Sequence, residues 1–150
     1  MTDAAPVVPP TIVAWREFAK TRDPAGLDDL LADDCVFRSP AVHTPQAGKA
    51  LTTAYLSAAL VVLGPTLRYV EEWYAETSAV LEFEAEIDGL TVHGVDMIRW
   101  DDAGRITSFT VMVRPHKGLE VLMGAMLIEL TRAPAEVTEA PTVWAADARC

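Results

Sequence analysis

The chain has 150 residues, of which 51% are apolar and 23% are charged, and acidic residues outnumber basic ones by 22 to 12. This size and composition are typical of one soluble globular domain. A formal net charge of −10 argues against binding to nucleic acid or to anionic membranes, because both need clustered Lys and Arg. We therefore expect neither partner.

The cysteines and the chain ends indicate a reduced, cytoplasmic setting. Cys35 lies in an apolar run and Cys150 is the last residue, so the two cannot form a disulfide framework. Residues 1–10 lack the basic start of a secretory signal peptide. The apolar run at residues 121–128 is much shorter than the roughly 20 residues of a membrane-spanning helix. We expect a cytoplasmic protein.

The first half of the chain predicts three helices. Residues 12–22 carry apolar side chains at spacings of three and four, which indicates one buried helical face. Asp23 can cap a second, short helix that begins at Pro24 and ends near residues 33–34. Residues 48–64 predict a longer helix, because a Gly opens it and a Gly-Pro pair closes it.

The second half changes to a period of two, which is the pattern of strands. Together with an early strand that stops at Pro40, the predicted strands cover residues 35–39, 67–76, 79–87, 90–100 and 105–114. Asp88-Gly89 predicts a hairpin turn. A last helix is predicted over residues 118–130.

Helices followed by strands are typical of an α+β architecture, in which the helices pack on one face of a sheet. We expect a cone-shaped, curved antiparallel sheet with three N-terminal helices on its concave face, plus a C-terminal helix. Such a sheet leaves a blind cavity, which is where small ligands bind. The expected organisation is a loose arm over residues 1–11, one domain over residues 12–130 and a tail over residues 131–150.

The first candidate for chemistry is Asp96, in the middle of the strand predicted over residues 90–100. Alternation places it on one face with Val92, Ile98 and Trp100. Burial among apolar side chains would raise its pKa, and a neutral carboxyl can donate a hydrogen bond to a developing oxyanion. The alternative is a solvated carboxylate on the outer face.

No metal site is expected. His93 and Asp96 point to opposite faces of their strand, and the pair His116 and Glu120 lacks a third ligand. The sequence also lacks a glycine-rich phosphate loop and the turn that exposes a catalytic serine. We therefore expect no cofactor.

Three segments, taken together, resemble one protein family. They are LLADDCVFRSP at residues 30–40, PQAG at residues 45–48 and GVDMIRWDDAGRITSF at residues 94–109. Their order and spacing resemble the ketosteroid isomerase and SnoaL-like group of the nuclear transport factor two superfamily, over residues 12–115. The resemblance implies the cone-shaped fold of that superfamily, which is also called cystatin-like.

The resemblance also suggests positions for a site. Ketosteroid isomerases use an Asp base, a Tyr donor and a protonated Asp donor, and these positions correspond to Ser39, Trp15 and Asp96. A Ser hydroxyl is too weakly basic to replace the Asp unaided, so standard ketosteroid isomerisation is not expected. His43 is the candidate replacement base, with a solvent-exposed loop residue as the alternative. Trp15 and Tyr55 are candidate auxiliary donors.

The preferred function is a SnoaL-like enzyme without a cofactor, acting on a hydrophobic, carbonyl-bearing small molecule such as a polyketide or steroid-like ring system. The chemistry would be acid–base proton transfer in an isomerisation, cyclisation or dehydration. The alternatives are a non-catalytic small-molecule-binding protein and a dimerisation module of the same fold. Besides the four candidate catalytic residues, the expected substrate-binding residues are Phe18, Phe37, Ser39, Leu56, Phe83, Ile98, Trp100, Phe109, Val111 and Val113.

A homodimer is expected through the outer face of the sheet. Val95 and Met97 alternate with Asp96, so the strand over residues 90–100 is apolar on both faces. One layer of helices covers only one face of a sheet, which leaves these two side chains for a second copy of the chain.

Overall fold

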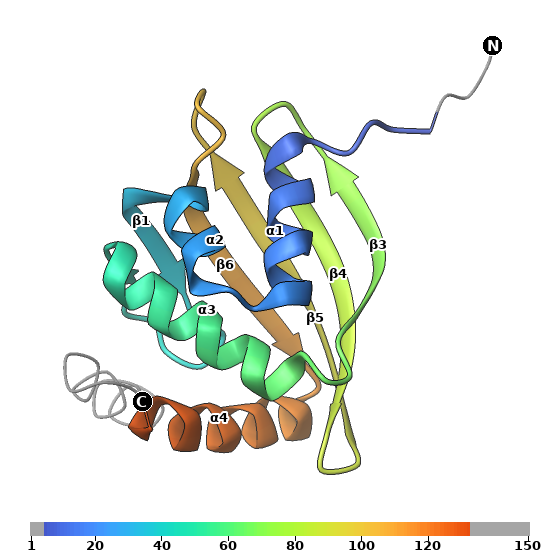
Figure 1. Cartoon of the computed structure of the whole chain (residues 1–150). Coiled ribbons are helices and arrows are strands. Elements are labelled where there is room, and N and C mark those ends of the chain that lie inside the picture. The colour runs from blue at the N-terminus through green and yellow to red at the C-terminus, as the bar shows by residue number, and fades with distance from the viewer. Residues whose placement is uncertain (1–4, 133–150) are drawn as a thin grey trace.

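The computed structural model describes residues 5–132 and shows a curved six-stranded sheet with helices packed against it (Figure 1). The helices are α1 (Pro10–Thr21), α2 (Pro24–Leu30), α3 (Lys49–Leu63) and α4 (His116–Thr131). The strands are β1 (Leu31–Arg38), β2 (Gln46–Ala47), β3 (Arg68–Tyr74), β4 (Ser78–Ile87), β5 (Leu90–Trp100) and β6 (Ile106–Arg114). The predicted α+β class is confirmed.

The sheet has the strand order β2-β1-β6-β5-β4-β3. Strands β3 to β6 form the predicted antiparallel meander, with tight turns between neighbours. The prediction of a wholly antiparallel sheet is wrong at one pair, because β1 runs parallel to β6. In Figure 1, α1, α2 and α3 lie across one face of the sheet, and α4 runs along its lower end. The N-terminal helices and the sheet therefore enclose the core between two layers.

Local sequence signals explain where α2 begins, but not where it ends. The Asp23 carboxylate accepts a hydrogen bond from the backbone N–H of Ala25 at 3.0 Å, and Pro24 is the first helical residue. The predicted end near residues 33–34 is wrong, since α2 stops at Leu30. Leu31 instead pairs with Ile106 of β6, and its side chain is fully buried. Pairing with a strand that is distant in sequence therefore places these residues in β1, where the local pattern predicted helix.

The narrow end of the sheet depends on a glycine in β5. Gly94 lies opposite Phe83 of β4 on the inner face. A Cβ at position 94 would come within 2.7 Å of the Phe83 ring and 2.3 Å of the carbonyl oxygen of Met112. The missing side chain lets the buried Phe83 ring pack directly on the backbone of β5, two residues before Asp96.

The first and last helices of the described residues are α1 and α4. Helix α1 begins at Pro10, so residues 10 and 11 of the expected arm are helical, and α4 ends at Thr131. The Thr11 hydroxyl donates a hydrogen bond to the carbonyl oxygen of Gly104, which ties this end of α1 to the turn before β6. Residues 1–4 of the arm and residues 133–150 of the tail lie outside the described residues.

Within residues 5–132, no helix has the length and apolar character needed to cross a membrane.

The outer face of the sheet carries an apolar row that crosses three strands. Trp73 of β3 lies opposite Val80 of β4, and Val80 lies opposite Met97 of β5. In the next register position, Val95 lies opposite Met112 of β6. Half of the surface of Trp73 and 55% of that of Met112 are exposed. The N-terminal helices lie on the other face, so these side chains form an uncovered apolar patch (Figure 1).

We propose that two chains pair through this outer face, with Val95 and Met97 at the centre. Sedimentation velocity at micromolar concentration is expected to show a dimer. The double substitution Val95→Lys and Met97→Lys should give a monomer, because it buries two charges without partners in the contact. Val61→Lys, which changes an exposed apolar side chain of α3, is the matched control and should leave the dimer intact. A monomer at every concentration of the unmodified protein would exclude this interface.

Candidate functional site

A small apolar cavity of about 40 Å³ lies between the sheet and the helices. Helices α3 and α4 supply an aliphatic wall, and the strands supply aromatic and aliphatic side chains. The lining residues are Trp15, Phe37, Pro40, Leu56, Ala59, Leu60, Leu63, Leu67, Tyr69, Asp96, Phe109, Val111, Leu122 and Met126. Asp96 is the one carboxylate among them, so the cavity is a mainly hydrophobic chamber with a single acidic group.

An irregularity in β3 decides which of its side chains face this chamber. The pairing of β3 with β4 shifts register between Tyr69 and Glu71. A strand without such a bulge would place residues 69, 71 and 73 on one face, because side chains alternate. Here Tyr69, Glu72 and Tyr74 instead pair with the inward-facing Phe83, Leu81 and Ala79. The bulge therefore brings three polar side chains to the concave face.

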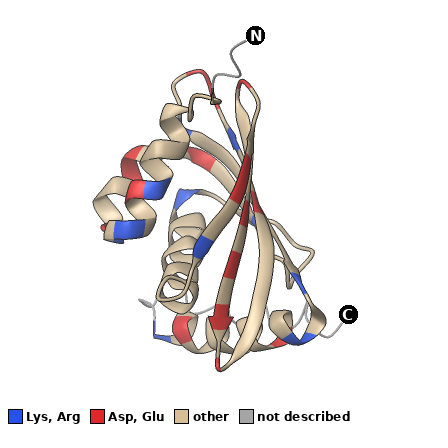
Figure 2. Cartoon of the chain, turned by 90° about the vertical axis from the view of Figure 1, so that its right-hand side faces the viewer, with Lys and Arg blue, Asp and Glu red and all other residues tan. Residues whose placement is uncertain are grey.

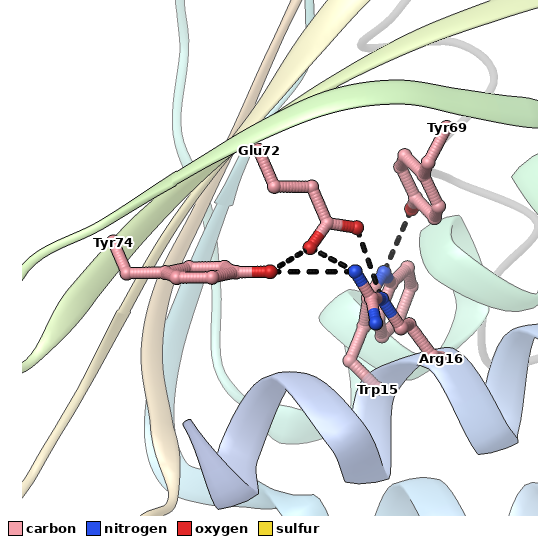
Figure 3. A network of polar contacts seen from close by, with 5 residues as sticks. All are labelled: Trp15, Arg16, Tyr69, Glu72 and Tyr74. Carbon is pink, nitrogen blue, oxygen red and sulfur yellow. Dashed lines mark hydrogen bonds and ion pairs between the residues drawn. The ribbon is translucent and has the colours of Figure 1, made fainter. Parts of the chain in front are cut away.

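Trp15 of α1 and Tyr69 of β3 join Asp96 in a chain of hydrogen bonds. The indole Nε1 of Trp15 donates to the hydroxyl oxygen of Tyr69 at 2.8 Å, as Figure 3 shows. The Tyr69 hydroxyl in turn donates to Oδ2 of Asp96 at 2.8 Å. Within the described residues, Oδ1 of Asp96 has no hydrogen-bond partner. Oδ1 is therefore the carboxyl oxygen that is left to meet a molecule in the cavity.

Burial controls the protonation of Asp96. Only 7% of its surface is exposed, and the loss of hydration raises the pKa of Asp96 to about 7, against the smaller lowering effect of the hydrogen bond from Tyr69. Burial, followed by the charge of Asp96, raises the pKa of Tyr69 well above its ordinary value. Near neutral pH, Asp96 therefore exchanges between its acid and its carboxylate forms, while Tyr69 keeps its proton. A group with this pKa can both accept and release protons efficiently.

A second polar cluster holds α1 against β3. The Nε atom and one terminal nitrogen of Arg16 each donate a hydrogen bond to the carboxylate of Glu72 (Figure 3). The Tyr74 hydroxyl donates to the same carboxylate. The side chain of Glu72 is 8% exposed, and its hydrogen bond raises the pKa of Arg16. A two-pronged pair of this kind sets orientation as well as distance. Because Trp15 precedes Arg16, the cluster also positions the indole over Tyr69.

The structure brings six of the predicted site residues to the cavity and leaves eight outside its lining. The six are Trp15, Phe37, Leu56, Asp96, Phe109 and Val111. The others are Phe18, Ser39, His43, Tyr55, Phe83, Ile98, Trp100 and Val113. Most of this second group are buried core residues next to the lining, and Tyr55, for example, stacks on Phe37 with ring centroids 5.3 Å apart.

Ser39 and His43, the two polar residues considered at or near the position of the missing base, do not line the chamber. His43 is exposed on the loop between β1 and β2. The Ser39 hydroxyl accepts a hydrogen bond from the backbone N–H of Ala41 at 3.0 Å, so it shapes the turn after β1. The chain stays next to the chamber just after β1, because Pro40 lines it, while the Ser39 hydroxyl is engaged by the turn and His43 reaches solvent.

Sequence reasoning missed Tyr69, the residue that contacts Asp96 directly. Its strand was predicted, but simple alternation groups Tyr69 with Glu71 and Trp73, and the bulge separates them. It also missed Leu122 and Met126 of α4, although their spacing of four was visible as one helical face. No group of three or more potential metal ligands occurs among residues 5–132.

The curved sheet, the covering helices and the blind apolar chamber define an α+β protein of the nuclear transport factor two-like, or cystatin-like, class. A model of the SnoaL-like domain matches residues 12–109, and the chain belongs to this family. A comparison with curated proteins gave no match.

Similar solved structures support the same fold. A steroid delta-isomerase from Pseudomonas aeruginosa is 39% identical, with a TM-score of 0.77 over 81% of this chain and 90% of that one. An uncharacterised protein with a cystatin-like fold from Silicibacter pomeroyi is 27% identical, with a TM-score of 0.79 over 89% of this chain and 94% of that one. An NTF2-like protein from Mesorhizobium loti is also 27% identical, with a TM-score of 0.60 over 70% and 91%.

The buried carboxyl should make stability depend on pH in a defined direction. The folded-state pKa of Asp96, about 7, lies above the unfolded value of roughly 3.9, so its contribution is complete below pH 4 and is lost as pH rises through 7. Asp96→Asn removes this dependence. Its free energy of unfolding, relative to the unmodified protein, should therefore rise by up to about 1.4 kcal/mol per pH unit between these values. Urea denaturation across this range measures the difference.

The control for this measurement is Asp102→Asn, which changes an exposed carboxylate in the turn before β6. It should show no comparable rise. A difference between Asp96→Asn and the unmodified protein that stays constant with pH would mean that Asp96 titrates alike in the folded and unfolded states.

The hydrogen bond from Tyr69 should oppose the effect of burial on Asp96. Tyr69→Phe removes the donor that favours the carboxylate, so the pKa of Asp96 should rise above 7. Tyr74→Phe removes the hydroxyl of the other inward-facing tyrosine of β3, which contacts Glu72. This control is expected to leave the pKa of Asp96 unchanged. The carboxyl carbon shift of Asp96 in NMR spectra, followed against pH, reports both values. A lower pKa in Tyr69→Phe would contradict the assignment of donor and acceptor.

Proposed function

We propose that this protein is a cofactor-independent enzyme that uses Asp96 to move a proton on a hydrophobic, carbonyl-bearing small molecule, such as a polyketide or steroid-like ring system. The observation that carries the proposal is one carboxyl group with a pKa of about 7 at the wall of an apolar chamber. The similarity to a steroid delta-isomerase supports the same class of chemistry. Isomerisation, cyclisation and dehydration all require such a proton transfer.

We assign both halves of the transfer to Asp96. Neither Ser39 nor His43 lines the chamber, so no second base meets the substrate there within the described residues. As a carboxylate, Asp96 would remove a proton from the carbon next to the carbonyl, which leaves an enolate. As the resulting acid, it would return that proton to another carbon of the conjugated system. The substrate atoms then balance, and the enzyme returns to its starting form.

Tyr69 can respond to the charge on Asp96 during this cycle. While Asp96 is a carboxylate, the Tyr69 hydroxyl donates to it. Once Asp96 has taken up the proton, it no longer needs this donor, and Tyr69 can donate to the negative oxygen of the enolate. Trp15 holds the Tyr69 oxygen in place by donating to it. A donor aimed at developing charge in a chamber without bulk water stabilises the transition state strongly.

Substrate entry must enlarge the chamber. Pockets for drug-sized ligands have volumes of about 300–1,000 Å³, whereas this cavity has about 40 Å³. The wall from α3 and α4 contains Leu60, Leu63, Leu122 and Met126, whose side chains change rotamer at little cost. We therefore expect the helical wall, and not the sheet, to yield to a ligand.

The test uses a β,γ-unsaturated ketosteroid as the probe, with the absorbance of the conjugated product as the signal. Slow turnover is expected, because Ser39 stands where the ketosteroid isomerases have their base and Asp96 alone must move the proton. Asp96→Asn should lower kcat by about 100-fold or more, and kcat/KM should increase as pH rises through 7, where the carboxylate forms. Asp102→Asn should match the unmodified protein.

Efficient turnover that survives Asp96→Asn would contradict the proposal. Tight binding of the probe without any turnover would instead favour a non-catalytic small-molecule-binding protein. The lack of a second base in the chamber is the observation that favours this second function.

A further inference from the structure

A second hollow, of about 360 Å³, lies directly beside the chamber. It is bounded by the C-terminal half of α1 on one side and by the connection from α3 to β3 on the other. Its lining residues are Arg16, Ala19, Lys20, Arg22, Gly64, Leu67 and Tyr69. Leu67 and Tyr69 line the chamber as well, so the two hollows share one wall. We refer to the second hollow as the basic groove.

The basic groove is positively charged on a strongly acidic protein. Three of its seven lining residues are cations and none is an acid, although the whole chain has a net charge of −10. The guanidinium of Arg16 is paired with Glu72. Lys20 and Arg22 form no ion pair or side-chain hydrogen bond with any residue in the range 5–132, and both are exposed. Figure 2 shows acidic residues on the helices as well as on the strands, and Glu17 and Asp23 adjoin cations of the groove in the sequence, but neither lines the groove.

The side chain of Arg22 lies beside Gly64, the C-cap residue of α3. Arg22 ends α1 in the left-handed conformation, with φ at 56°, and its N–H bonds to the carbonyl oxygen of Phe18 at 2.7 Å. A terminal nitrogen of its guanidinium lies 3.0 Å from the point where a Cβ of Gly64 would be. The Arg22 guanidinium therefore lies against Gly64, although the carbonyl oxygen of Leu60, 2.2 Å from the same point, is the contact that most strongly excludes a side chain there.

We propose that the basic groove binds an anionic group, a carboxylate or a phosphate ester, on a ligand whose apolar part occupies the chamber. The proposal rests on the chamber being a binding site, as the proposed function requires. A ligand that passes Leu67 and Tyr69 would bring an acidic end to Lys20 and Arg22 while its apolar body reaches Asp96. The substrate is then an amphipathic acid, and the contacts far from the reacting carbon add binding energy that helps to position it.

Three probes with the same chain and different head groups test this inference: dodecanoate, dodecyl phosphate and dodecanol, each titrated into the full-length protein by isothermal calorimetry. At least one anionic probe should bind about 3- to 10-fold more tightly than dodecanol, the range that two exposed charge contacts supply. Added salt should weaken the anionic probe only. Whichever head group binds more tightly identifies the carboxylate or the phosphate ester as the natural acidic group.

The double substitution Lys20→Gln and Arg22→Gln should abolish the advantage of the anionic probes and leave dodecanol binding unchanged. Lys117→Gln, which removes an exposed cation of α4 outside the groove, is the matched control and should keep the advantage. The double variant and the control both change exposed side chains, and circular dichroism checks that each variant is folded.

Equal binding of the three probes, or an anionic advantage that persists in the double variant, would overturn the inference while leaving the chamber as a binding site. Failure of all three probes to bind would overturn it together with the chamber. An anionic advantage that the double variant removes, combined with no proton transfer in the ketosteroid assay, would support the groove and reject the proposed catalysis. The failure of each proposal is therefore recognisable by itself.

Discussion

The central constraint on this structure is the burial of one carboxyl group, that of Asp96, at the wall of an apolar chamber. Asp96 lies on the inner face of β5 with apolar neighbours in the strand and in the helical wall, and this environment raises its pKa to about 7. The hydrogen bonds from Tyr69 and through it from Trp15 limit the cost of its charged form. A drier site would keep Asp96 permanently protonated, and a wetter one would keep it permanently ionised. In the proposed function, this balance would let a single group serve as both base and acid.

This balance depends on how α1 and β3 meet. The bulge in β3 turns Tyr69 and Glu72 to the same side of the sheet, so one strand supplies both a partner for Asp96 and an anchor for α1. The pair between Arg16 and Glu72 then holds the helix that carries Trp15. Figure 3 shows the two groups of contacts side by side: Trp15 donates to Tyr69, and Arg16 and Tyr74 bind Glu72, so both groups link α1 to β3.

The distribution of charge suggests how a ligand approaches such a site. The chamber is small and apolar, whereas the neighbouring groove is larger and cationic. On a chain with a net charge of −10, Lys20 and Arg22 line this groove without an ion pair to any residue in the range 5–132. The shared wall of Leu67 and Tyr69 links the two hollows, so the residue that supports Asp96 also stands at the boundary with the groove.

The sequence by itself determined the α+β class, the cap of α2 at Asp23 and the bounds of β5, because these follow from local hydrophobic periodicity, capping and turn residues. It grouped Asp96 with Val92, Ile98 and Trp100, and only the packing of the helices made that face the inner one. Only the tertiary structure decided the end of α2, since Leu31 pairs with β6, which is distant in sequence. It also left His43 and Ser39 out of the chamber lining and brought Tyr69 to Asp96. Alternation is a local rule with a period of two, and one extra residue in β3 reverses it without any mark in the pattern.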